Sequence, residues 1–111
     1  MAIFYYSRRG DTAPLTDTLQ NNLGIAVNLT GATIRFHAMD RLGVTLVNAL
    51  ATGPGGGALD VTGQVRYAVV AADVVNALTA FVEWQVTFGD GTIQTWPQND
   101  NGIWIIYPDL A

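Results

Sequence analysis

The chain contains no cysteine and no lysine, and several reactive residue types occur only once. Without cysteine it has neither a disulfide framework nor a thiolate metal site. Ser7 is the only serine, His37 the only histidine and Glu83 the only glutamate. A Ser-His-Asp triad would need Ser7 and His37, which fall on different predicted strands. The aspartates fall almost entirely in predicted turns, where aspartate satisfies the backbone. We therefore expect no catalytic site, no bound metal and no cofactor.

Charge is also sparse, since five arginines stand against nine acidic residues and give a net charge of -4. This balance argues against nucleic-acid binding, because that affinity comes from neutralising phosphates. It argues equally against docking on an anionic membrane. No apolar run approaches the ~20 residues of a membrane-spanning helix. The apolar N-terminal residues precede Arg8 and Arg9, the reverse of the order in a secretory signal. We expect neither nucleic acid nor membrane as a partner.

What the chain does contain is period-two alternation of apolar and polar residues, which predicts strands with one buried face. The pattern is clear in residues 33–39, where Ile34, Phe36 and Ala38 share one face and Thr33, Arg35 and His37 the other. Further strands are predicted at residues 3–8, 15–19, 44–50, 64–69, 79–88, 92–96 and 103–107. The only helix candidate is residues 71–78, which allow barely two turns.

The spacing of these strands, with turn signals every eight to twelve residues, favours an antiparallel sandwich or barrel. We therefore predict an all-β antiparallel β-sandwich of seven to eight strands with at most one short helix, formed by a single domain over residues 1–111. The expected inner faces carry Ile34, Phe36, Val65, Tyr67, Val82, Trp84 and Val86.

The alternation does not show whether the side chains of two tryptophans point into the core or toward solvent. Trp96 and Trp104 flank a polar turn, and both orientations are open. Exposed indoles would suggest a sugar-binding platform or a protein interface. Buried indoles would be part of the core, which is the default for large aromatic residues.

Several blocks, taken in order, resemble the N-terminal domain of baseplate upper proteins of tailed bacteriophages. They are Arg9-Gly10-Asp11-Thr12-Ala13-Pro14, residues 27–36 around Leu29-Thr30-Gly31-Ala32-Thr33, residues 62–67, residues 81–92 ending in Gly89-Asp90-Gly91-Thr92, and Trp96-Pro97. The resemblance covers nearly the whole chain. It implies an immunoglobulin-like sandwich that anchors larger baseplate or fibre pieces to the particle, and it carries no catalytic residue.

On this resemblance we interpret the chain as a non-enzymatic bacteriophage structural protein, an adaptor or attachment domain of the tail, baseplate or fibre. Its expected partners are other virion proteins, in multiple copies, and its expected location is the virion, assembled in the bacterial host cytoplasm. We expect no receptor-binding region downstream of this domain, which makes a head decoration or head-fibre adaptor protein an alternative. A carbohydrate-binding module that uses Trp96 and Trp104 is another, and a small hydrolase is opposed by the residue inventory.

The apolar character of both ends of the chain predicts an assembly interface, because free termini seldom carry runs of large apolar residues without packing them. The candidate interface residues are Phe4, Tyr6, Phe81, Trp96, Trp104 and Tyr107. Strand alternation should leave half of these side chains facing outward.

Overall fold

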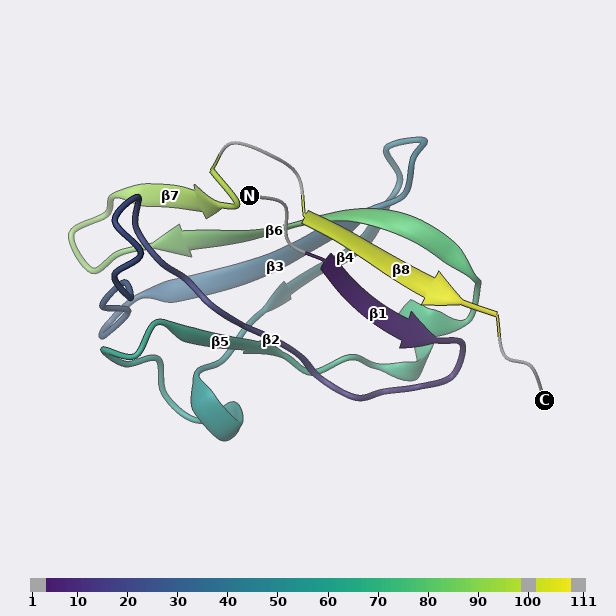
Figure 1. Cartoon of the computed structure of the whole chain (residues 1–111), viewed down its shortest axis with the longest axis horizontal. Coiled ribbons are helices and arrows are strands. Elements are labelled where there is room, and N and C mark those ends of the chain that lie inside the picture. The colour runs from purple at the N-terminus through teal and green to yellow at the C-terminus, as the bar shows by residue number, and fades with distance from the viewer. Residues whose placement is uncertain (1–3, 99–101, 109–111) are drawn as a thin grey trace.

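The computed structural model describes residues 4–98 and 102–108, which form eight strands and two 3-10 turns (Figure 1). The elements are β1 (Phe4–Arg8), β2 (Leu15–Thr18), β3 (Thr33–Met39), β4 (Thr45–Leu50), η1 (Pro54–Gly56), β5 (Gln64–Tyr67), η2 (Ala71–Val74), β6 (Leu78–Thr87), β7 (Ile93–Trp96) and β8 (Gly102–Tyr107). The predicted all-β sandwich is therefore confirmed, with strands close to the expected positions.

The strands form a six-stranded sheet, in the order β1-β8-β6-β3-β4 with β7 also on β6, and a two-stranded sheet of β2 and β5. The long strand β6 organises the larger sheet. One of its edges pairs with β3, and the other pairs first with β8 and then with β7. Every pair is antiparallel except β1 with β8, which is parallel. The prediction of a wholly antiparallel sandwich is wrong at this pair, because no hairpin connects the two strands and fixes their direction.

The helix candidate over residues 71–78 does not form an α-helix, which agrees with the prediction of at most one short helix. The segment makes one 3-10 turn, η2, and β6 begins at Leu78. The Asp73 carboxylate accepts hydrogen bonds from the Val70 N–H (3.0 Å) and the Tyr67 hydroxyl (2.5 Å), which fixes the turn. A segment this short gains too few helical hydrogen bonds to repay nucleation, and its valines prefer extended backbone.

The core lies between the two sheets, and all seven residues predicted for the inner faces are buried. Phe36 of β3 stacks on Tyr67 of β5, with ring centroids 4.7 Å apart, and so joins the two sheets. Trp84 of β6 also packs on Phe36, at 4.7 Å. The predicted facing of these strands is confirmed, since a shift of one residue would have exposed the whole set.

A hydrogen-bonded chain that runs from the core to the half-buried Asp17 ties three strands together. Trp84 Nε1 donates to the Tyr5 hydroxyl (2.8 Å), which donates to Asp17 Oδ2 (2.6 Å). Burial, and then the hydrogen bond to Asp17, raise the pKa of the Tyr5 hydroxyl far above its ordinary value. Burial and the hydrogen bond to Asp73 raise the pKa of Tyr67 in the same direction.

These two tyrosines predict a loss of stability in alkali. In the unfolded chain each hydroxyl loses its proton near pH ~10, while in the folded chain the raised pKa keeps it protonated. The unfolded state therefore binds fewer protons above about pH 10, and the free energy of unfolding falls as pH rises. Urea unfolding at about pH 8 and about pH 11 measures this fall. The fall should be smaller in Tyr5→Phe and Tyr67→Phe, and an unchanged fall in both variants would contradict the assignment.

Candidate protein interface on the outer face of the large sheet

Apolar side chains form a row across four strands on the face of the larger sheet that points away from the core. Phe4 of β1 lies beside Ile103 of β8, Ile103 beside Phe81 of β6, and Phe81 beside Met39 of β3. Phe4 and Met39, at the two ends of the row, are 50% and 44% exposed. The row therefore presents a continuous apolar strip to solvent.

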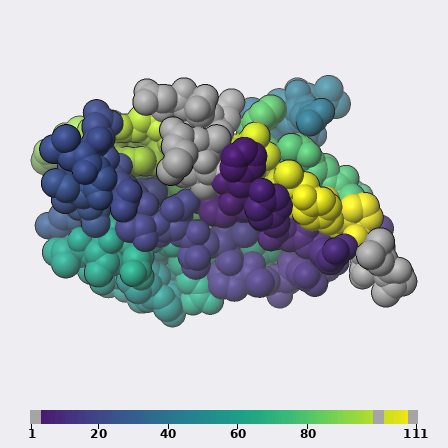
Figure 2. Space-filling model, viewed as in Figure 1, coloured from purple at the N-terminus to yellow at the C-terminus, as the bar shows by residue number. Residues whose placement is uncertain are grey.

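A second group of aromatic residues extends this strip along β1 and β8. Tyr6 lies beside Ile105, and Tyr107 lies beside Arg8. The rings of Tyr6 and Tyr107 stack with centroids 6.2 Å apart, and both are well exposed. In the space-filling view, the purple atoms of the N-terminal strand lie directly against the yellow atoms of β8 (Figure 2). We call the combined surface the outer patch, made of Phe4, Tyr6, Met39, Phe81, Ile103, Ile105 and Tyr107.

Polar residues border the outer patch on β3, β4 and β6. His37 of β3 lies beside Glu83 of β6, two residues along these strands from Met39 and Phe81. The distance between His37 Nδ1 and Glu83 Oε1 is 3.1 Å. Further along the same face, Arg35 Nη1 donates to Asn48 Oδ1 at 3.2 Å. The outer face is thus divided into an apolar half around β1 and β8 and a polar half around the end of β3.

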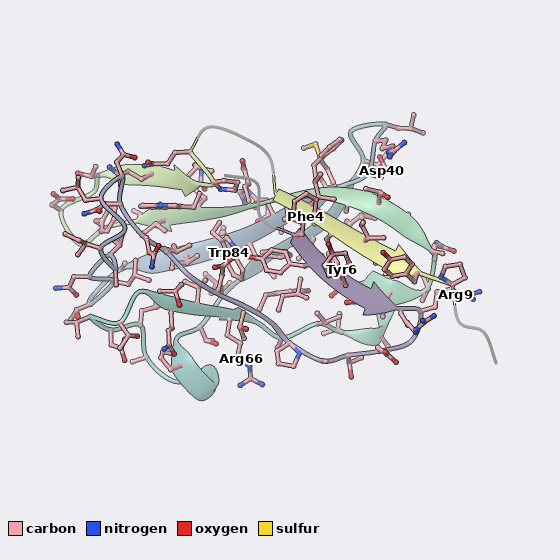
Figure 3. The ribbon with its side chains drawn as sticks, in the orientation of Figure 1. Phe4, Tyr6, Arg9, Asp40, Arg66 and Trp84 are labelled. Atoms are coloured by element: carbon pink, nitrogen blue, oxygen red, sulfur yellow. The ribbon has the colours of Figure 1, made fainter. Side chains whose placement is uncertain are left out.

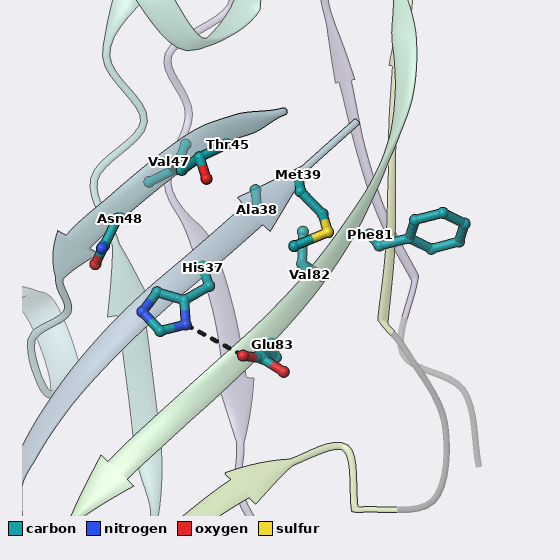
Figure 4. A pocket seen from close by; sticks show the side chains of 9 residues that line it. All are labelled: His37, Ala38, Met39, Thr45, Val47, Asn48, Phe81, Val82 and Glu83. Carbon is teal, nitrogen blue, oxygen red and sulfur yellow. Dashed lines mark hydrogen bonds and ion pairs between the residues drawn. The ribbon is translucent and has the colours of Figure 1, made fainter. Parts of the chain in front are cut away.

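A shallow hollow of about 280 Å³ lies on this border, between β4, β3 and β6 (Figure 4). Met39 and Phe81 line it on the apolar side, and His37, Glu83 and Asn48 line it on the polar side. The close-up shows the contact between His37 and Glu83, with Met39 and Phe81 further along the same two strands. The hollow suits a side chain that has an apolar body and a polar end.

Four of the six candidate interface residues come together in the outer patch: Phe4, Tyr6, Phe81 and Tyr107. Figure 3 shows Phe4 and Tyr6 projecting from β1. The other two candidates, Trp96 and Trp104, are buried, so the expectation that they form an exposed interface is wrong. Trp96 Nε1 donates to the Gln20 carbonyl and Trp104 Nε1 to the Ser7 hydroxyl, each at 3.0 Å. Each indole therefore buries its large apolar area while its N–H keeps a partner.

The sequence prediction missed three members of the outer patch, Met39, Ile103 and Ile105. A signal for Met39 was present, because it follows Arg35 and His37 on the outward face of residues 33–39. Ile103 and Ile105 alternate with the buried Trp104 and Ile106. Four successive large apolar residues hid that alternation in the sequence, since apolar runs do not show which face is buried.

Ser7 and His37, which a catalytic triad would need, each contact a different residue. Ser7 Oγ accepts from Trp104, and the hydrogen bonds of the described residues do not join Ser7 to His37, which contacts Glu83. Over residues 4–98 and 102–108, no group of three or more histidine, aspartate or glutamate side chains is placed to hold a metal ion. Within the same ranges, no helix has the length and apolar character needed to cross a membrane.

Comparison of the chain with models of known protein families finds no match, and a search among curated proteins finds no similar sequence. The outer patch is a contiguous apolar surface of the described residues, of the kind that marks sites of association.

Proposed function

We propose that this protein is a non-enzymatic structural component of a bacteriophage virion, an adaptor or attachment domain of the tail, baseplate or fibre. The observation that carries the proposal is the outer patch, whose seven apolar side chains are contiguous across four hydrogen-bonded strands. Contiguous exposed apolar surface of this kind is uncommon on soluble monomers and marks sites of association.

The composition of the outer patch supports a protein partner. Tyrosine, phenylalanine and methionine are enriched at the centres of protein interfaces, and lysine, which this chain lacks, is depleted there. The patch also stands on a rigid sheet, so its side chains lose little further freedom on binding. A face of this kind suits repeated, permanent contacts within a particle.

The structure bears differently on the two alternative functions, a head protein and a carbohydrate-binding module. A head decoration or head-fibre adaptor protein would use the same outer patch and differ only in its location in the particle. The carbohydrate-binding alternative depended on exposed indoles at Trp96 and Trp104, and both are buried. We therefore keep the two virion roles as outcomes of one experiment and do not propose sugar binding.

The experiment compares incorporation into virions of the phage that encodes the chain. The double variant Phe4→Asp with Tyr6→Asp places two charges in the outer patch, where desolvating them opposes association. We expect quantitative mass spectrometry of purified particles to show at least about a tenfold drop in its copy number. Gold labelling of wild-type particles then distinguishes tail from head.

The matched control is Ile93→Asp, because Ile93 is 58% exposed on β7 of the same sheet but lies outside the outer patch. This variant should be incorporated like the wild type. Absence of the wild-type chain from particles would overturn the proposed function. Normal incorporation of the double variant would show that the outer patch is not needed for assembly into the particle.

A further inference from the structure

We infer that the occupant of the outer patch is a second copy of this chain, in a closed two-fold pair of the two outer faces. This inference rests on the proposed use of the outer patch as an interface and names its partner. Two properties of the surface support it: the arrangement of charge at its corners, and a hollow and an aromatic projection at opposite ends.

Opposite charges lie at diagonally opposite corners of the outer patch. Glu83 is on β6, two residues beyond Phe81 on the same face of the sheet, and the neighbour of Phe81 on β8 is Ile103. Arg8 is on β1, two residues beyond Tyr6 on the same face, and the neighbour of Tyr6 on β8 is Ile105. Since β6 and β1 flank β8 on its two sides, the midpoint between the two charges falls on β8 between Ile103 and Ile105.

The two-fold axis that lies in the contact plane, passes through this midpoint and is perpendicular to the line joining the two charges exchanges the two corners. When two copies pack face to face about such an axis, Arg8 of each copy meets Glu83 of the other. Both groups reach the surface: Arg8 is exposed and donates to the Pro108 carbonyl at 3.1 Å, and 43% of the Glu83 side chain is accessible beside His37. An arginine facing a carboxylate across a partly desolvated contact fixes the orientation of the pair.

The same axis brings the aromatic projection of each copy onto the hollow of the other. Tyr107 lies beside Arg8 in the sheet, and the hollow is lined by Glu83. Alignment of the charges therefore places the exposed Tyr107 ring over the hollow. Met39 and Phe81 would pack on the ring, and His37 or Asn48 offers a hydrogen-bonding group to the phenol hydroxyl.

The position of these features on one face makes the pair closed. Each copy presents its projection and its hollow on the same side of the sheet, so one partner fills both at once. An isologous pair of this kind leaves no free site for a third copy, whereas features on opposite faces would build chains. The inferred assembly is therefore a dimer.

Sedimentation velocity on the purified full chain tests the inference by charge exchange. We expect the wild type to dimerise with a Kd in the micromolar range, typical of small interfaces. Arg8→Glu or Glu83→Arg alone should weaken dimerisation at least about tenfold, because each puts like charges together. The two substitutions combined should restore the Kd to within about threefold of wild type. Arg66→Glu changes the net charge as Arg8→Glu does but lies on β5 in the other sheet (Figure 3), and should leave the Kd unchanged.

Cross-linking provides a second measurement that uses the absence of native cysteine. Proteins carrying Tyr107→Cys or Asn48→Cys are mixed and treated with a short bifunctional maleimide. We expect a covalent heterodimer from the mixture and much less product from Asn48→Cys alone. Species larger than a dimer in sedimentation velocity would overturn the closed pair, and a wild-type chain that stays monomeric throughout would overturn dimerisation.

The outcomes separate this inference from the proposed function. If the wild type is a monomer but the Phe4 and Tyr6 double variant is lost from virions, the outer patch binds a different virion protein and only the inference fails. If the chain dimerises as expected but is absent from virions, only the proposed function fails.

Discussion

Replacing Trp84 with alanine will lower the free energy of unfolding by about 3–5 kcal/mol. Trp84 is fully buried, packs on Phe36 at 4.7 Å, and meets the Tyr5 ring edge-on at 6.2 Å. Alanine removes these contacts, leaves a cavity, and deprives the Tyr5 hydroxyl of its indole donor. Total stability of a domain this size is about 5–15 kcal/mol, so the variant should be close to unfolded in mild denaturant. Urea unfolding followed by circular dichroism measures the change.

Trp84→Phe is the matched control for this prediction. Phenylalanine retains an aromatic ring in the core but removes the indole N–H that donates to Tyr5. Its cost should lie well below that of alanine, because the remaining ring fills much of the same space. Equal losses in the two variants would show that the hydrogen bond, and not the packed volume, dominates at this position.

Gly63→Ala is expected to cost about 2–4 kcal/mol, from left-handed backbone strain and from collision. Gly63 has φ of +71° and lies where the turn before β5 contacts the chain on either side of residues 20–26. An added Cβ would lie 2.7 Å from the Leu19 carbonyl oxygen and 3.1 Å from both the backbone nitrogen and oxygen of Val27. Because all three atoms are backbone, the turn itself must move.

Gly10→Ala separates the two causes. Gly10 has φ of +82°, but an added Cβ would have no heavy atom of the described residues within 4 Å beyond its chain neighbours. Its cost should therefore be about 1–2 kcal/mol, from the backbone conformation alone. Thermal unfolding of the two variants measures the difference, and equal losses would contradict the role given to the contacts of Gly63.

The core was predictable because alternation is a local signal. Residues 33–39 and 79–88 each contain enough alternating positions to show which face is dry, and Ile34, Phe36 and Trp84 are buried as that signal required. The form of the helix candidate over residues 71–78 could not be decided for a related reason. So short a segment has too little periodicity to separate a turn from a helix, and tertiary contacts such as Tyr67 with Asp73 decide its form.

The outer patch was only partly predictable, because it depends on which strands are neighbours. Phe4 and Tyr107 could be named from the apolar ends of the chain, but no local pattern pairs β1 with β8 or sets them parallel. The same lack of local information left Trp96 and Trp104 undecided. Their burial follows from partners distant in the sequence, Gln20 for Trp96 and Ser7 for Trp104.

The pairing of β1 with β8 also determines when the native structure can form during synthesis. Phe4 pairs with Ile103 and Arg8 with Tyr107, so the first described strand waits for the last before it gains its partner in the sheet. Contacts so distant in sequence must repay the entropy of closing a long loop, which places folding of such β-proteins on a millisecond-to-second scale. While the ribosome completes residues 102–107, the backbone N–H and C=O groups of β1 that pair with β8 lack that partner. Premature association through this N-terminal segment is therefore a hazard until the final strand docks.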